Sequence, residues 1–348
     1  MDLNSVFTSE FYGNRWASGT ITWSVATFGS RAPTEEEMAL LRKAFQLWDE
    51  ALESVTFQEV SPNNGGAQIQ VGLGETNGLS GYWSATWSTV RTGASITLAP
   101  DLDPALFAVA AAHEIANVLG LGDIDGGGYV ESLTSDPFSS FHLTNPNLNY
   151  LSRIDFELIN QLYGEDSTDY LGYLAGLSIF SQVIVGDSNS ALAESFSGTD
   201  GADLVLGYAG DDTLIGGSGN DLIFAEDGRD LIIGGDGADV MHGGFGANIF
   251  GDSRDGSVDQ ILIHSDHFLM NPLTGTTAEN TSGEYVDILE GLDPSDNIFI
   301  EAGFGRSLEV RDTTGGLGLY VDGIIEALYT GNDLSAAQLF SMTEIVAA

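Results

Sequence analysis

A nine-residue period runs through the sequence from residue 198 to residue 251 and repeats six times. The fourth position of every repeat is glycine, and the sixth is aspartate in five repeats and asparagine in the last. Positions seven to nine are mostly apolar. A glycine-rich linker has no reason to keep this phase over 54 residues. The period therefore predicts stacked structural units, each burying its apolar residues against its neighbours.

The residue types in each repeat suit the binding of a cation. Glycine permits left-handed turns that leave carbonyl groups free to face an ion, and aspartate supplies the anionic oxygen that Ca²⁺ prefers. The apolar residue after the aspartate is expected to point inward from a short strand, so that the coils share a narrow core. The candidate calcium-binding residues are Asp203, Asp212, Asp221, Asp230, Asp239 and Asn248, with the glycines Gly201, Gly210, Gly219, Gly228 and Gly237.

This pattern resembles the RTX calcium-binding repeat. The resemblance implies a parallel β-roll in which turns two repeats apart hold an ion between them. Ala225 and Glu226 depart from the glycine pair that usually starts a repeat, and the neutral Asn248 predicts that the last site is weak. The implied pairs are Asp203 with Asp221, Asp212 with Asp230, Asp221 with Asp239, and Asp230 with Asn248.

The charge of the chain favours cations as partners. Lys and Arg number 10 against 51 Asp and Glu, which gives a net charge of −41. A surface this acidic repels phosphate, so nucleic acid is excluded as a partner. No run of 18 apolar residues is present, so membrane insertion is not expected. Without cysteine, no disulfide or thiolate supports the fold or a site.

Calcium dependence predicts where the protein works. Without Ca²⁺ the crowded carboxylates should keep the repeats unfolded, so that metal binding supplies the folding energy. Sites with dissociation constants of roughly 10⁻⁴–10⁻³ M fill only outside the cell, which predicts a secreted, extracellular protein. The N-terminus lacks the basic and apolar segments of a secretory signal. The family resemblance instead implies export by type I secretion machinery, and the tail at residues 342–348 is compatible with its signal.

The N-terminal half predicts an α+β domain. A strand is expected at residues 20–26, with further strands near residues 69–71 and 95–98. Thr34 and Glu37 form a capping box before an amphipathic helix. Asp103 and Pro104 start a buried helix that ends near residue 119. A third helix is expected from Ser152 onward.

The buried helix carries the string from His113 to Asp123, which resembles the metzincin zinc-protease signature H-E-x-x-H-x-x-G-x-x-H. In that signature, side chains four residues apart on a helix reach one metal, and the glutamate acts as general base on zinc-bound water. The surrounding strands, helices and repeats resemble the serralysin branch across essentially the whole chain. The implied fold class is an α+β metzincin-like domain at residues 1–185, an all-β parallel RTX β-roll at 186–251 and a C-terminal β cap at 252–348.

The residues that differ from the protease signature stand at its metal-ligand positions and in its methionine turn. His113 and Glu114 match, but the second ligand position holds Asn117 and the third holds Asp123. In the segment that resembles the methionine turn, Thr134 replaces methionine and Asp136 replaces tyrosine. Because catalytic zinc requires three protein ligands, mostly imidazole, this pattern predicts a retained scaffold with a lost reaction and at most weak zinc binding.

Three functions follow from these residues. The first is a calcium-binding protein with an inactive protease domain, which acts as a binding or structural protein with a cleft for a peptide or protein ligand. The second is an active zinc endopeptidase that uses His113, Asp123 and a non-standard ligand such as His142, with Glu114 as base. The third is an enzyme of another reaction, in which His113, Glu114, Asp123 and Asp136 serve as acid and base groups. Separately, His264 and His267 form either a metal pair or two surface histidines.

Overall fold

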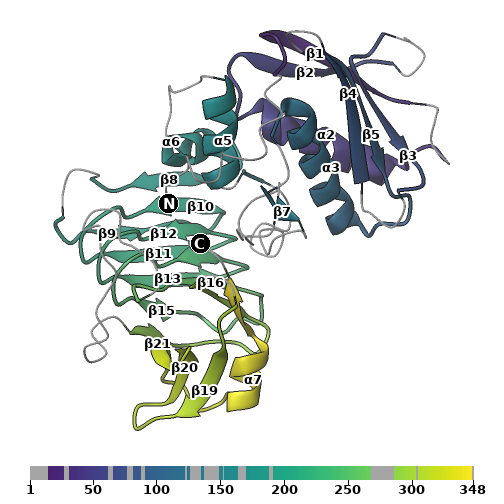
Figure 1. Cartoon of the computed structure of the whole chain (residues 1–348). Coiled ribbons are helices and arrows are strands. Elements are labelled where there is room, and N and C mark those ends of the chain that lie inside the picture. The colour runs from purple at the N-terminus through teal and green to yellow at the C-terminus, as the bar shows by residue number, and fades with distance from the viewer. Residues whose placement is uncertain are drawn as a thin grey trace. The chain divides into compact units, whose positions relative to one another are not determined.

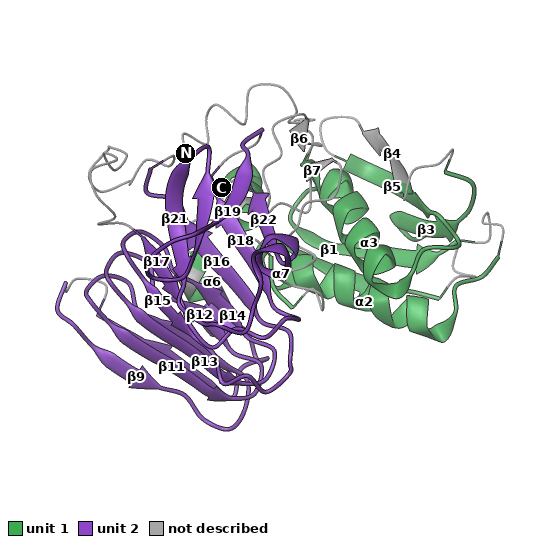
Figure 2. Cartoon of the chain, turned by 90° about the horizontal axis from the view of Figure 1, so that it is seen from below, with its two compact units in different colours: residues 1–173 green, residues 174–348 purple. Residues whose placement is uncertain are grey.

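The structure is a computed structural model, and it divides the chain into two compact units, residues 1–173 and 174–348 (Figures 1 and 2). None of the helices in the described residues is long and apolar enough to cross a membrane. The residues described are 15–26, 31–61, 66–76, 81–87, 91–121, 124–125, 135–136, 149–151, 153–163, 170–187, 191–267, 286–302 and 305–346.

The first unit contains a five-stranded sheet in the order β2-β1-β3-β5-β4. Three neighbouring pairs are parallel, and β4 runs antiparallel to β5 at the edge. The segment predicted at residues 20–26 is confirmed as β1, and those near 69–71 and 95–98 as β3 and β5. The strands are β1 Gly19–Val25, β2 Val55–Glu59, β3 Ile69–Leu73, β4 Gly81–Trp87 and β5 Arg91–Leu98, and a short parallel pair is formed by β6 Ile124–Asp125 and β7 Ser135–Asp136.

Local capping chemistry sets the helix ends in this unit. The predicted capping box of Thr34 and Glu37 is present before α2 Glu35–Asp49. Asp103 accepts a hydrogen bond from the backbone N–H of Leu106 and caps α3 Pro104–Leu119, which ends at the left-handed Gly120 (φ 117°). The predicted third helix is α5 Arg153–Tyr163, followed by α6 Tyr170–Gly176.

The second unit is built from two sheets of mostly parallel strands (Figure 1). All strands of the seven-stranded sheet, ordered β22-β18-β16-β14-β12-β10-β8, pair in parallel. The bounds are β8 Gln182–Val185, β10 Asp203–Leu206, β12 Leu222–Phe224, β14 Val240–His242, β16 Gln260–His264, β18 Asn297–Glu301 and β22 Thr343–Val346.

The eight-stranded sheet has the order β19-β20-β21-β17-β15-β13-β11-β9 and is parallel from β9 to β21. Consecutive repeats alternate between the two sheets, so that equivalent residues 18 positions apart stand side by side, as Leu204 and Leu222 do. The bounds are β9 Ser195–Ser197, β11 Thr213–Ser218, β13 Leu231–Asp236, β15 Ile249–Gly251, β17 Asp287–Leu289, β19 Leu308–Asp312, β20 Leu317–Val321 and β21 Ile324–Tyr329.

The side chain that packs in the core between the two sheets is that of the second residue after each sixth-position residue. The sequence had predicted the first. The burial of the first residue varies from repeat to repeat, since Leu204 is fully buried whereas Ile249 is 38% exposed. Alternation along a strand sends neighbouring side chains to opposite faces, which explains why only one of them can face inward. The fully buried residues, one for each repeat, are Val205, Leu214, Ile223, Ile232, Met241 and Phe250.

Residues beyond 251 add strands to the same two sheets. β16, β18 and β22 continue the seven-stranded sheet, and β17 and β21 continue the eight-stranded one. A tight hairpin at Asp322-Gly323 joins β20 to β21, and both residues have positive φ (49° and 85°). A short helix, α7 Ala336–Ser341, precedes β22. At the other end β8, which lies before residue 186, pairs with β10.

Candidate metal centres

The sixth-position residues of the repeats stand where the chain enters each strand. Asp203 is the first residue of β10, and Asp221 directly precedes β12. The others follow the same rule, because each repeat forms one turn and then one short strand. All six side chains are buried, with at most 2% of any residue exposed. Buried carboxylates need partners, so their contacts decide what this arrangement can do.

From Asp212 onward, one side-chain oxygen of each sixth-position residue accepts a backbone N–H of the neighbouring coil, whereas Asp203 Oδ2 accepts from Thr199 in its own turn. The backbone N–H of Asp203 donates to Asp221 Oδ1 at 2.8 Å, and that of Asp221 donates to Asp239 Oδ1 at 2.8 Å. In the other sheet the N–H of Asp212 donates to Asp230 Oδ1 at 2.8 Å, and that of Asp230 to Asn248 Oδ1 at 3.0 Å. The structure thus brings together all four residue pairs predicted from the sequence, in two series that we call ladders.

The other oxygen of each of these aspartates has no hydrogen-bond partner. The Oδ2 atoms of Asp212, Asp221, Asp230 and Asp239 are buried without a hydrogen-bond partner, as is Oδ1 of Asp203. An ionised carboxylate accepts through both oxygens and donates through neither. A cation is the partner that would satisfy these atoms.

First-position glycines leave an oxygen-lined space beside these atoms. A Cβ placed on Gly216 would lie 2.3 Å from Asp221 Oδ2 and 2.6 Å from the carbonyl oxygen of Gly234 in the next coil. At Gly207, the corresponding distances are 2.9 Å to the carbonyl oxygen of Ala225 and 3.1 Å to Asp212 Oδ2. Carboxylate and carbonyl oxygens are the donors that Ca²⁺ takes, so the residues present fit this ion.

The fourth-position glycines are needed for close approach between coils. A Cβ on Gly228 would lie 1.8 Å from the carbonyl oxygen of Gly210, and one on Gly237 would lie 1.9 Å from that of Gly219. The expected left-handed backbone occurs at Gly210, Gly219 and Gly237, with φ between 116° and 137°. Gly201 and Gly228 do not have positive φ. Their role is therefore to admit the neighbouring coil rather than to turn the chain.

Asn248 makes the same ladder hydrogen bond as an aspartate would, but an amide nitrogen replaces the second carboxylate oxygen. Its Oδ1 accepts the N–H of Asp230, as a carboxylate would, while its Nδ2 is buried without a hydrogen-bond partner. An amide nitrogen is a donor and cannot bind a cation. The weak site predicted at Asp230 and Asn248 stays a prediction, and this geometry gives its physical reason.

Burial raises the pKa of the ladder aspartates. The pKa of Asp221 rises to about 6, that of Asp230 to about 7 and that of Asp239 to about 8. Loss of hydration is the main cause, the backbone N–H bond opposes it, and the charge of the neighbouring ladder aspartate adds to it. Without a cation, these carboxylates are therefore poorly tolerated in their charged form.

These shifts predict how pH acts on the metal-free chain. A carboxyl whose pKa is higher folded than unfolded stabilises the fold below the unfolded value, near 4, and this stability falls as pH rises toward the folded value. The metal-free second unit should therefore be more ordered at pH 5 than at pH 8, as measured by circular dichroism after chelation and desalting. Ca²⁺ competes with these protons, so its apparent affinity should rise over the same range. Equal order at both pH values without calcium would contradict this prediction.

Three ladder residues outside the repeats were not predicted. The backbone N–H of Asp239 donates to Asp259 Oδ1 at 2.8 Å, that of Asp259 to Asp296 Oδ1 at 3.2 Å, and that of Asn248 to Asp287 Oδ1 at 2.6 Å. All three aspartates are buried. The signal in the sequence was an aspartate directly before or within a short apolar run, as in Val-Asp-Gln-Ile at 258–261, Val-Asp-Ile at 286–288 and Asp-Asn-Ile at 296–298.

In the first unit, the protease-like residues lie on one buried helix. His113, Glu114 and Asn117 in α3 are each at most 8% exposed. Asn117 Nδ2 lies 3.2 Å from His113 Nε2. Strand β4 passes directly over Glu114, because a Cβ on Gly81 would lie 2.7 Å from Glu114 Oε1. The helix geometry thus brings the first two ligand positions together, but the second supplies an amide.

The other residues of the predicted zinc site are not among those that the structure describes. Asp123, Thr134 and His142 lie outside the described residues, as does the side chain of Asp136. In the second unit, His264 Nδ1 lies 2.8 Å from Glu301 Oε2, and His267 Nδ1 lies 3.4 Å from the carboxylate of Glu326. The two histidines therefore contact different acids.

Comparison with known protein families finds the RTX calcium-binding nonapeptide repeat (4 copies) at residues 190–223, 197–232 and 215–250. These ranges contain every sixth-position residue of the period. A search of curated proteins finds no match to the chain. The chain therefore carries RTX calcium-binding repeats, which confirms the assignment of the period and of calcium as its ion. The match does not extend to the first unit or to residues beyond 250.

Proposed function

We propose that this chain is a secreted protein whose β-roll folds when it binds several calcium ions outside the cell. The observation that carries this proposal is the set of five buried repeat aspartates, Asp203, Asp212, Asp221, Asp230 and Asp239, each with one carboxylate oxygen that lacks a hydrogen-bond partner. The expected ligands are the ladder residues, with carbonyl oxygens of the glycine turns. Equilibrium dialysis of the full chain against radioactive calcium should find several ions bound; a chain that binds none refutes the proposal.

The extracellular part of the proposal rests on affinity and charge. Nonapeptide sites are expected to bind in roughly the 10⁻⁴–10⁻³ M range of extracellular calcium modules, and the cytosol holds too little calcium to fill them. Inside the cell the chain would keep its charge of −41 uncompensated and would remain unfolded in the second unit. An unfolded chain suits passage through a narrow export channel, and calcium on the far side would then fold it.

For the first unit, we propose a serralysin-like domain whose zinc site no longer cuts peptides and whose role is binding or structural. The contact between Asn117 and His113 supports this. Asn117 Nδ2 donates, so the lone pair of His113 Nε2, which would bind zinc, is already occupied. Loss of even an indirect partner of a zinc ligand typically lowers affinity about 10–100-fold, and loss of a ligating imidazole should lower it further.

Restoring the imidazole should restore zinc affinity. The wild-type chain should hold less than one zinc per chain by elemental analysis and should not cleave casein. Asn117→His should raise zinc affinity at least about 10-fold, whereas Asn117→Gln, a similar increase in size without an imidazole, should not. One tightly held zinc in the wild type, with casein cleavage that is lost in Glu114→Ala, would show instead that the domain is an active endopeptidase.

A further inference from the structure

The ladder of the seven-stranded sheet continues past the last nonapeptide. Asp203, Asp221 and Asp239 are 18 residues apart, as the repeat requires. The next steps are 20 residues to Asp259 and 37 residues to Asp296, yet the same backbone-to-carboxylate bond is made at each. Both residues directly precede a strand, β16 and β18 respectively. The architecture is therefore maintained where the sequence period has ended.

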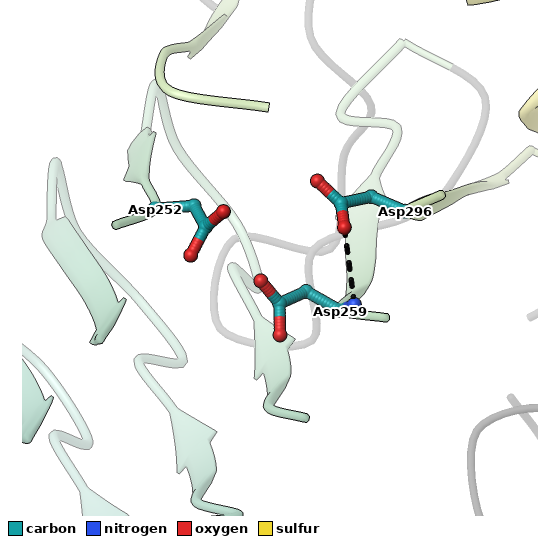
Figure 3. A group of neighbouring side chains, drawn as sticks. All are labelled: Asp252, Asp259 and Asp296. Atoms are coloured by element: carbon teal, nitrogen blue, oxygen red, sulfur yellow. Dashed lines mark hydrogen bonds between the residues drawn. The ribbon is translucent and has the colours of Figure 1, made fainter. Parts of the chain in front are cut away.

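A third carboxylate lies close to those of Asp259 and Asp296. Asp252, which follows β15, contributes an oxygen within 4.8 Å of oxygens of Asp259 and Asp296 (Figure 3). Asp259 and Asp296 are buried, at 0% and 1% exposed, and Asp252 is half-buried. The three residues come from three separate segments of the chain. Such carboxylates repel one another at close range unless a positive charge lies among them.

The contacts of Asp259 leave one of its oxygens available to a cation. Its Oδ1 accepts the backbone N–H of Asp239, but its Oδ2 is buried and has no hydrogen-bond partner. Figure 3 shows a carboxylate oxygen of Asp259 turned toward Asp252. A buried carboxylate oxygen without a partner is costly, and an ion among the three aspartates would remove that cost.

Backbone groups orient the other two carboxylates without neutralising them. Asp252 accepts the N–H groups of Ser253 at 2.6 Å and Arg254 at 3.1 Å. Asp296 accepts the N–H groups of Asp293 at 2.6 Å and Asp259 at 3.2 Å. The guanidinium of Arg254 does not supply the charge, because it pairs with Asp333. The carboxylates are thus held in place, as metal ligands must be.

We propose that Asp252, Asp259 and Asp296 bind one calcium ion that lies outside the nonapeptide repeats. This inference rests on the proposed function, since it assumes that the ladders are occupied by calcium. Three carboxylates supply hard anionic oxygens, and Ca²⁺ accepts irregular sets of six to eight oxygens completed by carbonyl groups or water, whereas Mg²⁺ demands near-ideal octahedral geometry. The bound ion links the end of β15 to the entries of β16 and β18.

Isosteric variants of the full chain test this site. Asp259→Asn and Asp252→Asn remove one charge each. Asp259→Asn keeps an oxygen for the bond from the N–H of Asp239, and Asp252→Asn keeps an oxygen for one of its two backbone bonds. Asp312→Asn, at an exposed aspartate at the end of β19, is the control with the same change of charge. By equilibrium dialysis at saturating calcium, Asp259→Asn and Asp252→Asn should each bind one ion fewer than the wild type, and Asp312→Asn should match the wild type.

The outcomes separate this inference from the proposed function. If the wild type binds no calcium, the proposed function fails and this inference fails with it. If the wild type binds calcium, and Asp259→Asn and Asp252→Asn both bind as many ions with the same affinity, only the additional site is refuted. Should Asp259→Asn fail to fold in calcium, Asp252→Asn decides the question, because Asp252 is half-buried and its hydrogen bonds are made to its own loop.

Discussion

Removing calcium with EGTA at pH 8 should abolish most of the β-sheet signal of the second unit in far-UV circular dichroism, and restoring calcium should recover it. The physical reason is the cost of ladder carboxylates without a cation. One unit of pKa corresponds to about 1.4 kcal/mol, and burial raises the pKa of Asp230 to about 7 and that of Asp239 to about 8 from an ordinary value near 4. Each therefore destabilises the metal-free fold by several kcal/mol. Together they rival the whole stability of an ordinary domain, roughly 5–15 kcal/mol.

Magnesium is the control for this experiment. It carries the same charge but dehydrates reluctantly and prefers six oxygens in a regular octahedron. Excess Mg²⁺ should therefore not restore the signal at a concentration at which Ca²⁺ does. A second unit that keeps its sheet signal and its resistance to proteases after exhaustive chelation would contradict calcium-dependent folding.

Gly246→Ala should destabilise the second unit even in saturating calcium, by about 2–6 kcal/mol from close contact and backbone strain together. Gly246 has a φ of 122°, and a Cβ at this position would lie 1.6 Å from the carbonyl oxygen of Gly228. The two coils cannot separate to make room, because hydrogen bonds join their strands β13 and β15. Urea denaturation in excess calcium measures the loss of stability.

Gly256→Ala is the matched control for this variant. Gly256 also has a positive φ, 84°, but nothing lies within 4 Å of the position of its Cβ. Alanine there should cost only the left-handed backbone term, about 1–2 kcal/mol. Equal losses in the two variants would show that φ alone matters and that the close stacking of coils does not.

The sequence predicted those parts of the second unit that depend on a strict period. Six glycines and six sixth-position residues recur every nine positions, and the resemblance to the RTX repeat then implied the residue pairs of the ladders. The hairpin at Asp322-Gly323 depends on equally local information, because two adjacent residues that tolerate positive φ are sufficient to define it. Asp259, Asp287 and Asp296 were missed because the spacing between ladder residues grows to 20, 39 and 37 residues. Only the pairing of strands brings them into line.

In the first unit, too, features set by neighbouring residues were predicted, whereas contacts between residues far apart in the sequence were not. Asp103, Pro104 and Gly120 mark both ends of α3 within a few residues, and those ends agree with the prediction. Strand β2 was not predicted: only Val55 of its five residues is buried, so it lacks an alternating pattern. Nor could local sequence show that the buried Arg91 donates to the carbonyl oxygens of Asn117 and Val118 at the end of α3, because 26 residues separate it from the nearer one.

The alternation of nonapeptides between the two sheets has a consequence for how such a molecule can lengthen or shorten during evolution. Duplicating a single nonapeptide would transfer every later strand to the opposite sheet and would place Asp259 and Asp287 in each other's series. Duplicating two nonapeptides leaves this parity unchanged and lengthens each sheet by one strand. The heritable unit of growth in this architecture is therefore 18 residues, the distance between neighbouring ladder aspartates.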